Sequence, residues 1–434
     1  MSEAHAAGGS PTAVSQRITS PRMAMKAVPA GSRVAASPYC STPTTLLDAL
    51  AVRANEVAGI SLSAGLLLGD LGFLDSVVDG ALSYRTWHLG GPSRQVSHLA
   101  GLDYVPLRAR DVPGYLSSRV DVALARVTPP DAAGNCSLGP SASYTRAMLS
   151  SARIRIAEVD PHLPRTRGRD VTYPYSGFDI VVDSEQPMAM YPPSPSSPTA
   201  AAIAHHVVPI LRDGVTLQLG IGKVPEEIAH ALAHSDVRDL SLVGMMTDAM
   251  VDLAQHGRLT TRPNAIEAVE LLGTRRVFDF AHDNEAILMH SSTVIHDATW
   301  LGTHPSLVSV CSALAVDLTG QVASEEIDGR MISGVGGSID FFEGAHGSHG
   351  GLRVIALSAT TPSGASRIVS MLPARTPVTV PRHSVDYVVT EFGVAHLAER
   401  SLRERAAALV AIAAPEFRTA LSESGPYPPS RETQ

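Results

Sequence analysis

An α/β fold built on largely parallel sheets is the architecture that the sequence predicts, on three observations. Apolar runs rich in β-branched residues alternate with helical patterns along most of the chain. A Pro/Ser stretch at residues 191–198 interrupts this alternation and divides the chain into two nearly equal halves. With 434 residues the chain is also too long for one ordinary core, so we expect two or three domains.

Seven short apolar runs are expected to form strands, two in the first half and five in the second. They are residues 120–127, 154–159, 215–219, 240–245, 307–311, 354–357 and 385–390. The run at 241–246 leads directly into a helical pattern at residues 247–253. Near the end of the chain, Ser401 and Glu404 have the spacing of a capping box, which predicts a final helix continuing through Ala413.

Charge, hydropathy and cysteine content exclude several classes of protein. The net charge of −8 gives no basic footprint for nucleic acid. No apolar run approaches the length of a membrane span, so we expect no membrane segment. Cys40, Cys136 and Cys311 are far apart and odd in number, which predicts no disulfide framework and a reducing, cytoplasmic location. None of the histidines has metal-ligand spacing, and we expect no metal site.

The expected domain boundaries follow from shifts in composition. Residues 1–30 are rich in Ala, Ser and Gly without a continuous apolar core, which predicts a disordered N-terminal extension and no signal peptide. Residues 31–190 and 203–421 carry the α/β patterns and form the two expected domains. The Pro/Ser linker between them covers residues 191–202, and residues 422–434 are expected to be a flexible tail.

Two glycine-rich segments are candidates for ligand binding. Gly220-Ile221-Gly222 follows a strand and precedes a helix, so its backbone N–H groups are placed to bind a phosphate or a thioester oxyanion. Such a turn also needs glycine for steric reasons alone, and that alternative stays open. Gly334-Val335-Gly336-Gly337 permits close approach of the backbone to a ligand, or forms a flexible loop. Neither segment has the dinucleotide spacing GxGxxG, so no nicotinamide cofactor is inferred.

Further motifs, in the same order along the chain, resemble those of the acetyl-CoA hydrolase/CoA-transferase family, of the 4-hydroxybutyrate CoA-transferase type. The resemblance spans roughly residues 31–421 and includes Val127-Thr128-Pro129-Pro130-Asp131, Ala157-Glu158-Val159-Asp160, Val316-Asp317-Leu318-Thr319-Gly320-Gln321, Ser366-Arg367-Ile368-Val369 and Thr390-Glu391-Phe392-Gly393. It implies two α/β/α domains with the active site in the interdomain cleft. It also implies coenzyme A as substrate or product, no permanently bound cofactor, and a homodimer.

The resemblance also assigns site residues. It implies that Gly220, Ile221 and Gly222 face the thioester, with Lys223 beside them, and that Gly334, Val335, Gly336 and Gly337 pack against CoA. In family members that transfer CoA, a glutamate three residues before a Ser/Thr-Asp pair forms a covalent glutamyl-CoA intermediate. Here that pair is Thr247-Asp248, and the glutamate position is occupied by Gly244. We therefore expect a reaction that does not use the covalent glutamyl-CoA intermediate.

Three residues are weak candidates for a catalytic role in place of the glutamate. Asp248 lies at the start of the expected helix, where its charge also favours helix formation. Lys223 would place an ammonium near the thioester or a phosphate, or lie in solvent as a surface lysine. His88 falls in the region that resembles the substrate-facing part of the first domain.

Three functions remain open on the sequence. The first is a CoA-transferase or hydrolase acting on a small acyl-CoA, in which water or a carboxylate acceptor attacks the bound thioester directly. The second is an acyltransferase with a non-carboxylate acceptor. The third is a non-catalytic protein that binds a CoA ester.

Overall fold

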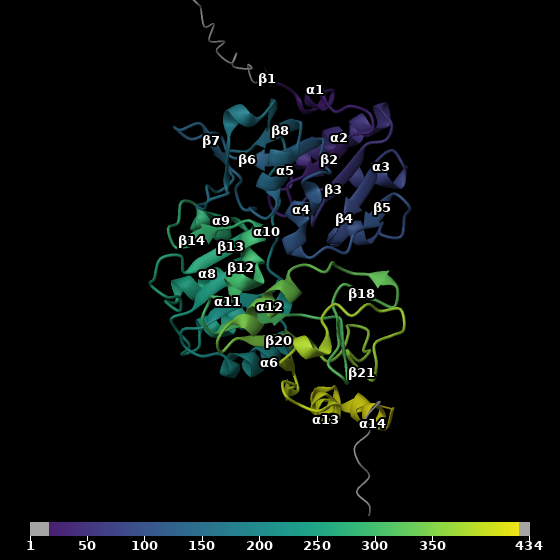
Figure 1. Ribbon diagram of the computed structural model, residues 1–434, viewed down its shortest axis with the longest axis vertical. Coiled ribbons are helices and arrows are strands. Elements are labelled where there is room, and N and C mark those ends of the chain that lie inside the picture. Colours follow the sequence, from purple (N-terminus) through teal and green to yellow (C-terminus); the bar gives the residue numbers. More distant parts are fainter. Residues whose placement is uncertain (1–16, 425–434) are drawn as a thin grey trace, which may run out of the picture.

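The computed structural model describes residues 17–424, which form two α/β/α domains stacked along the long axis of the molecule (Figure 1). The N-terminal domain is built on an eight-stranded sheet in which every neighbouring pair of strands is parallel, in the order β1-β10-β8-β6-β2-β3-β4-β5. Its strands are β1 (Arg17–Ile18), β2 (Arg33–Ala36), β3 (Ser61–Ala64), β4 (Ser83–Thr86), β5 (Leu102–Tyr104), β6 (Val122–Val127), β8 (Ile154–Val159) and β10 (Ile180–Asp183).

Helices cover both faces of this sheet because successive side chains of its strands point to opposite faces. Val34 in β2 packs into one buried cluster, and its neighbour Ala35 packs into another on the other face. Helices α1, α2 and α3 contribute to the first cluster, and α4 and α5 to the second. The helices are α1 (Pro21–Met25), α2 (Thr44–Glu56), α3 (Phe73–Val78), α4 (Val112–Leu116) and α5 (Thr145–Ser151); β7 (Asn135–Ser137) and β9 (Thr172–Pro174) form a separate pair.

The C-terminal domain repeats this plan with the strand order β14-β13-β12-β11-β15-β20-β22-β23. All neighbouring pairs are parallel except β22 and β23, which are antiparallel. The strands are β11 (Thr216–Leu219), β12 (Ser241–Thr247), β13 (Ile266–Leu272), β14 (Ile287–Met289), β15 (Leu307–Cys311), β20 (Leu352–Ala356), β22 (Tyr387–Thr390) and β23 (Gly393–His396).

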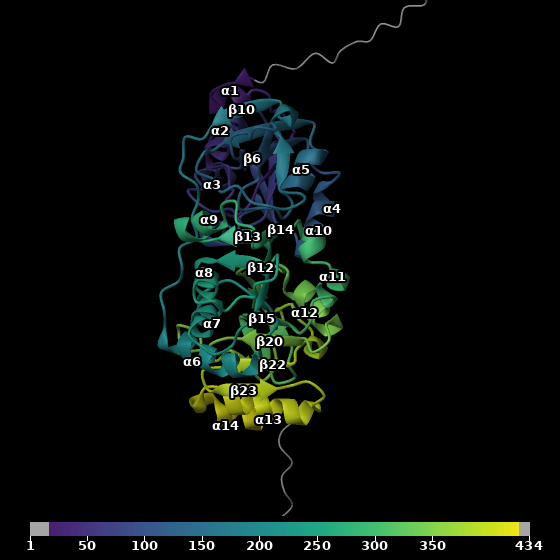
Figure 2. The same ribbon diagram turned by 90° about the vertical axis from the view of Figure 1, so that its left-hand side faces the viewer.

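Figure 2 shows α6, α7, α8 and α9 on one side of this sheet and α10, α11 and α12 on the other. The helices are α6 (Pro198–Val207), α7 (Lys223–Ala233), α8 (Asp248–Gln255), α9 (Arg275–Ala281), α10 (Ser292–Ile295), α11 (Ala298–Gly302), α12 (Ser338–Gly347), α13 (Leu402–Ile412) and α14 (Pro415–Ser424). Short strands β16 (Ala315–Asp317), β17 (Val322–Ala323) and β21 (Ile368–Val369) form a small sheet, and β18 (Glu326–Ile327) pairs with β19 (Arg330–Met331).

Several expected boundaries differ from those in the structure. The part of the expected N-terminal extension from residue 17 onward is folded, since β1 pairs with β10 and Met25 of α1 is 1% exposed. Residues 1–16 and 425–434 lie outside the described part of the chain. The expected 191–202 linker ends earlier, because Ser197 caps α6 and the helix begins at Pro198. The capping box of Ser401 and Glu404 is present, but α13 is not the final helix, because α14 follows it.

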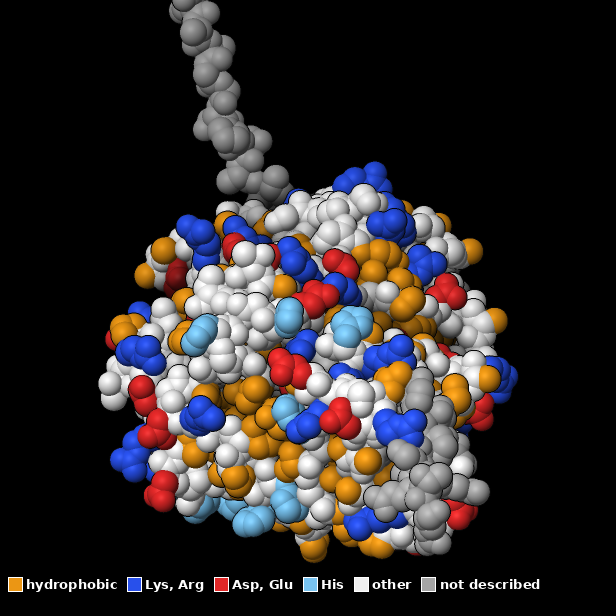
Figure 3. All heavy atoms as spheres, turned by 60° about the horizontal axis from the view of Figure 1, so that its bottom comes forward, with side chains coloured by type: hydrophobic (Ala, Val, Ile, Leu, Met, Phe, Trp, Pro, Cys, Tyr) orange, Lys and Arg blue, Asp and Glu red, His pale blue; other side chains and the backbone are white. Residues whose placement is uncertain are grey.

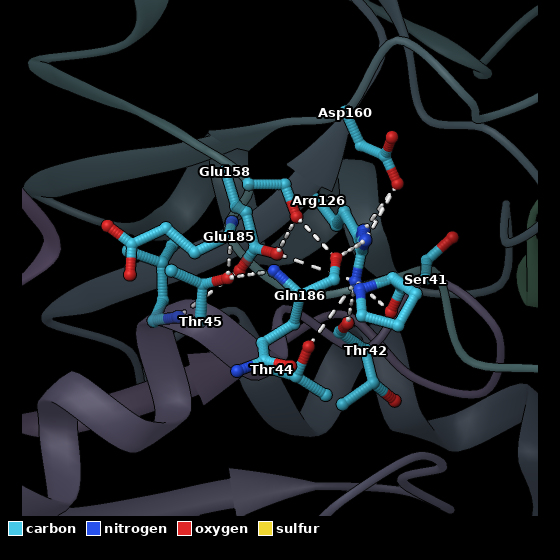
Figure 4. A network of polar contacts seen from close by, with 12 residues as sticks. Ser41, Thr42, Thr44, Thr45, Arg126, Glu158, Asp160, Glu185 and Gln186 are labelled. Atoms are coloured by element: carbon cyan, nitrogen blue, oxygen red, sulfur yellow. Dashed lines mark hydrogen bonds and ion pairs between the residues drawn. The ribbon is translucent and has the colours of Figure 1, made fainter.

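A buried arginine organises the interior of the N-terminal domain (Figure 4). Arg126 in β6 is 0% exposed, and its Nη2 donates to Asp160 Oδ2 at 2.7 Å and to the Gln186 carbonyl oxygen at 2.6 Å. Its Nη1 lies 3.4 Å from Glu158 Oε1. The charges are paired and the N–H groups of the guanidinium have acceptors. We therefore assign this network a structural role in the N-terminal domain.

On the face drawn in Figure 3, Lys and Arg side chains are interspersed with Asp and Glu, so this face has no large patch of one charge. Within residues 17–424, no helix combines the length and the apolar character that a membrane crossing requires.

Candidate active site

A cavity of about 390 Å³ lies between the two domains. Trp87 and His88 line it from the N-terminal domain, and Gly220 and Ile221 line it from the C-terminal domain. Gly220 follows β11, so the cavity opens at the carboxyl ends of parallel strands, the usual ligand site in open α/β sheets. The lining is mainly apolar with a few polar groups, which is typical of sites for small molecules.

The glycine turn after β11 lines this cavity and contains a backbone N–H that is not used within the described residues. The N–H of Gly220 is used, since it donates to the Val310 carbonyl oxygen at 3.0 Å. The N–H of Ile221 makes no hydrogen bond to any group in residues 17–424. Gly222 has φ +107 and caps α7, a conformation that favours glycine. Gly222 and the exposed Lys223 lie outside the residues that line the cavity.

The second glycine segment closes the cavity against the N-terminal domain. All four of its residues line the cavity: Gly334, Val335, Gly336 and Gly337. A Cβ on Gly334 would lie 2.2 Å from the Trp87 carbonyl oxygen, so close packing between the domains requires glycine there. The N–H of Ala109 donates to the Gly336 carbonyl oxygen at 2.9 Å, which joins the loop to the N-terminal domain.

Ion pairs next to this loop also join the two domains. Arg108 of the N-terminal domain pairs with Asp340 at 2.5 Å and with Glu343 at 2.6 Å, both in α12. Asp340 is 0% exposed, and its burial raises its pKa to about 6 although Arg108 acts in the opposite direction.

Gly244 does not line the cavity, because the space beside it is filled. Its φ is +111, and a β-bulge in the pairing of β12 with β13 follows it. A Cβ at this position would lie 3.1 Å from Phe341 Cζ and 3.2 Å from Gln218 Cγ. Phe341 and Gln218 themselves line the cavity, so neighbouring side chains occupy the place where a side chain of residue 244 would enter it.

The three candidate catalytic residues have different environments. Asp248 is 5% exposed and is absent from the cavity lining; its oxygens accept hydrogen bonds from the N–H groups of Thr274 at 2.9 Å and Val277 at 3.0 Å. It therefore caps the start of α9. Lys223 is exposed, as stated above. His88 lines the cavity with its Nε2 3.3 Å from Ser333 Oγ, and burial, followed by Arg94, lowers its pKa to about 4.

Two buried polar residues of the cavity were not foreseen in the sequence. Glu270 in β13 is 1% exposed, and burial raises its pKa well above the usual carboxyl range. His296, just after α10, is 4% exposed, and burial lowers its pKa to about 3. A single acidic residue inside the apolar run Val269-Glu270-Leu271-Leu272 was the available signal for Glu270. His296 had no comparable signal, because its partner Phe341 comes from a distant helix.

Cys311 at the end of β15 also lines the cavity. Its burial raises its pKa to about 12, so its thiol stays protonated and unreactive at neutral pH. Cys40 and Cys136 are free and buried as well.

Comparison with known proteins identifies the family of both domains. Residues 12–192 match the acetyl-CoA hydrolase/transferase N-terminal domain, and residues 273–425 match the C-terminal domain of the same family. Gly220, Gly244 and Glu270 fall between the two matched regions.

Individual relatives cover nearly the whole chain. A 4-hydroxybutyrate coenzyme A transferase of Clostridium kluyveri is 33% identical over 416 residues, 94% of this chain and 96% of that protein. A butyryl-CoA:acetate CoA-transferase of Anaerostipes caccae is also 33% identical, over 92% of this chain and 93% of that protein. The crystal structure of RipA from Yersinia pestis superposes with a TM-score of 0.87 at 27% identity, covering 94% of this chain and 96% of RipA. The chain belongs to the acetyl-CoA hydrolase/transferase family, whose members are enzymes that act on CoA thioesters.

Proposed function

We propose that this enzyme acts on a small acyl-CoA thioester bound between its two domains, and that water or an acceptor attacks the thioester directly. No covalent glutamyl-CoA intermediate takes part. The observation that carries this proposal is the environment of Gly244, where φ is +111 and Phe341 and Gln218 fill the space of a side chain. The cavity is present although Gly244 does not line it, so a glycine at this position has not removed the space for a ligand.

Direct attack has support from the groups that remain. The N–H of Ile221 is free to bind the oxygen of the thioester as negative charge develops on it, a contribution typically worth two to three powers of ten in rate, or about 2.7–4 kcal/mol. The loop from Gly334 to Gly337 would hold CoA against the N-terminal domain. The mainly apolar lining and the volume of about 390 Å³ suit a short acyl chain with the adjoining part of CoA.

We also propose a compartment and an oligomeric state for the protein. Its three cysteines are free and buried, which supports a reducing compartment such as the cytoplasm. A homodimer follows from the family resemblance, and light scattering on the purified protein tests it by mass.

The experiment is turnover of a panel of short-chain acyl-CoA esters, with water, acetate or a non-carboxylate acceptor, followed by mass spectrometry of the products. The protein itself is analysed after borohydride treatment for a reduced glutamyl adduct. Turnover without any adduct supports direct attack. An adduct on any carboxylate overturns it, and tight binding of every ester without turnover would identify a CoA-ester-binding protein instead.

A further inference from the structure

Glu270 occupies the position in the sheet that faces the bulge after Gly244. Strand β13 pairs with β12 in parallel, with Ala268 opposite Gly244 and, after the register shift, Glu270 opposite Met245. Glu270 and Met245 both line the cavity, together with Gly220 and Ile221. A carboxylate therefore reaches the cavity from β13, one strand away from the position that Gly244 leaves without a side chain.

The carboxyl group of Glu270 is only half satisfied. Its Oε1 accepts a 2.8 Å hydrogen bond from Ser141 Oγ, whereas Oε2 has no hydrogen-bond partner within the described residues. Six buried side-chain atoms lack a partner in residues 17–424, and four of them belong to residues that line this cavity: Ser143, Glu270, His296 and Ser338. Because buried polar groups are normally paired, this concentration indicates a site for a polar ligand.

Two other glutamates of the sheets, the buried Glu158 and the partly buried Glu267, have cationic or basic partners. Glu158 lies beside Arg126, and Glu267, three residues before Glu270 on the same strand, binds His290 at 3.0 Å and His304 at 2.8 Å. Glu270 forms no ion pair within the described part of the chain. The one arginine of the cavity lining, Arg367, donates to carbonyl oxygens, including that of Ala313 at 3.1 Å. A buried carboxyl group without a cationic partner binds its proton more strongly than one in water. Its carboxylate form is therefore a stronger base, which suits proton transfer.

We propose that Glu270 is a catalytic residue, the general base that takes a proton from the water attacking the bound acyl-CoA thioester; this rests on the function proposed above. In the step, the oxygen of water forms a bond to the thioester carbonyl carbon while its proton passes to Glu270 Oε2. The carbon–sulfur bond then breaks, CoA leaves as the thiolate, and the proton on Glu270 passes to that sulfur. The products are the free carboxylic acid and CoA thiol, and Glu270 returns to its starting form.

A general base at Glu270 also favours water over a carboxylate as the group that attacks the thioester. A general base is useful only to a nucleophile that carries a proton, and a carboxylate acceptor has none to give. A second carboxylate beside Glu270 would also meet like-charge repulsion in a site of low polarity. Hydrolysis, not CoA transfer to a carboxylate, is therefore the preferred reaction of this site.

The test compares the whole protein with its Glu270→Gln variant in acyl-CoA hydrolysis. The expected result is a loss of kcat of at least about 100-fold, the usual contribution of a general base, with KM changed less than about three-fold. The rising limb of the pH–rate profile, present in the unchanged enzyme, is expected to be absent in the variant. Glu267→Gln, the same change on the same strand but outside the cavity, is expected to keep kcat within about two-fold of the unchanged enzyme.

The outcomes distinguish failure of the proposed function from failure of the role proposed for Glu270. If the unchanged enzyme turns over no acyl-CoA, the proposed function and this inference both fail. If it turns over and Glu270→Gln keeps its kcat and pH profile, this inference alone fails. Single turnover in H₂¹⁸O is the second measurement: label in the product acid only supports a general base, whereas label in the peptide that contains Glu270 means nucleophilic attack and overturns it.

Discussion

The hydroxyl of Ser141 in the N-terminal domain donates a 2.8 Å hydrogen bond to Glu270 Oε1 in the C-terminal domain. The backbone on either side carries the same contact, since Ala142 N–H donates to the Val269 carbonyl oxygen at 3.1 Å and Leu271 N–H donates to that of Pro140 at 2.8 Å. The position of one domain against the other thus controls the environment of the carboxyl group. The proton transfer proposed for Glu270 would therefore depend on these contacts between the domains.

Replacing Ser141 tests this coupling. Burial raises the pKa of Glu270 most strongly, and the neighbouring Ser143 and the hydrogen bond from Ser141 act in the opposite direction, so Ser141→Ala is expected to raise that pKa further. The base must be ionised to act, so the rising limb of the pH–rate profile should move to higher pH. At pH 7, kcat/KM is expected to fall about ten-fold, which corresponds to about 1.4 kcal/mol, and to recover in alkaline buffer.

Two variants separate this effect from general damage. Ser141→Thr keeps a hydroxyl and should restore most of the activity, while Ser117→Ala removes an exposed hydroxyl far from Glu270 in the chain and should leave the profile unchanged. A profile that keeps its midpoint in Ser141→Ala would contradict the role given to this hydrogen bond.

Gly244 should tolerate no side chain without a loss of stability. Its φ of +111 strains any other residue, and a new Cβ would lie 3.1 Å from Phe341 Cζ. Gly244→Ala is expected to lower the free energy of unfolding by roughly 2–4 kcal/mol, measured by urea denaturation. Gly257→Ala is the matched control, because Gly257 also has positive φ (+64) but open space around its Cβ. Its cost should be about 1 kcal/mol, and equal costs at both sites would mean that the contact with Phe341 is unimportant.

Five of the eight strands of the C-terminal sheet, but only two of the eight in the N-terminal sheet, were predicted from the sequence as continuous apolar runs, which is the pattern of buried parallel strands. Strands β8 and β15 have the predicted bounds, residues 154–159 and 307–311. Strand β13 was missed, since Glu267 and Glu270 interrupt its apolar run and reduce its resemblance to a buried strand. The two acidic residues are stable there for reasons outside the strand: one binds two histidines and the other reaches the cavity.

The candidate site was only partly predictable for a related reason. Glycine segments such as those at Gly220 and Gly334 are visible in the sequence because their spacing is local. The approach of Glu270 to the cavity depends on a bulge in the neighbouring strand and on a hydrogen bond from the other domain. Neither relation is encoded by spacing along the chain, so only the three-dimensional structure brings them together.

The buried histidines of the cavity predict how stability depends on pH. Burial lowers the pKa of His296 to about 3, while in the unfolded chain it is about 6.5. Below pH 6.5 the unfolded chain binds a proton that the folded protein does not, so stability is lost as the pH falls. Between pH 7 and pH 5 this one group costs about 2 kcal/mol, and His296→Gln should remove that part of the loss in urea denaturation. The exposed His346 is the control, and His346→Gln should leave the pH dependence unchanged.

Arg108 and Asp340 form one of the two ion pairs that join α12, next to the glycine loop, to the N-terminal domain. Asp340 is fully buried, and its Oδ2 has no hydrogen-bond partner among residues 17–424. Arg108→Leu would leave its carboxyl group buried without a cation, which should destabilise the protein by about 2–4 kcal/mol at pH 8. Arg108 is about one-third exposed, so screening by solvent keeps the loss at the lower end of this range.

A double-mutant cycle identifies the source of this loss. Asp340→Asn is neutral at every pH, so it should remove most of the penalty of Arg108→Leu when the two changes are combined. The loss in the single Arg108→Leu variant should also shrink as the pH falls towards about 6, because Asp340 without Arg108 takes up its proton above the pH at which it does so beside Arg108. Additive effects at pH 8 would show that Arg108 acts through Glu343 or through its own packing. Coupling of about 1–3 kcal/mol would establish that closure of the loop depends on neutralising this one buried carboxyl group.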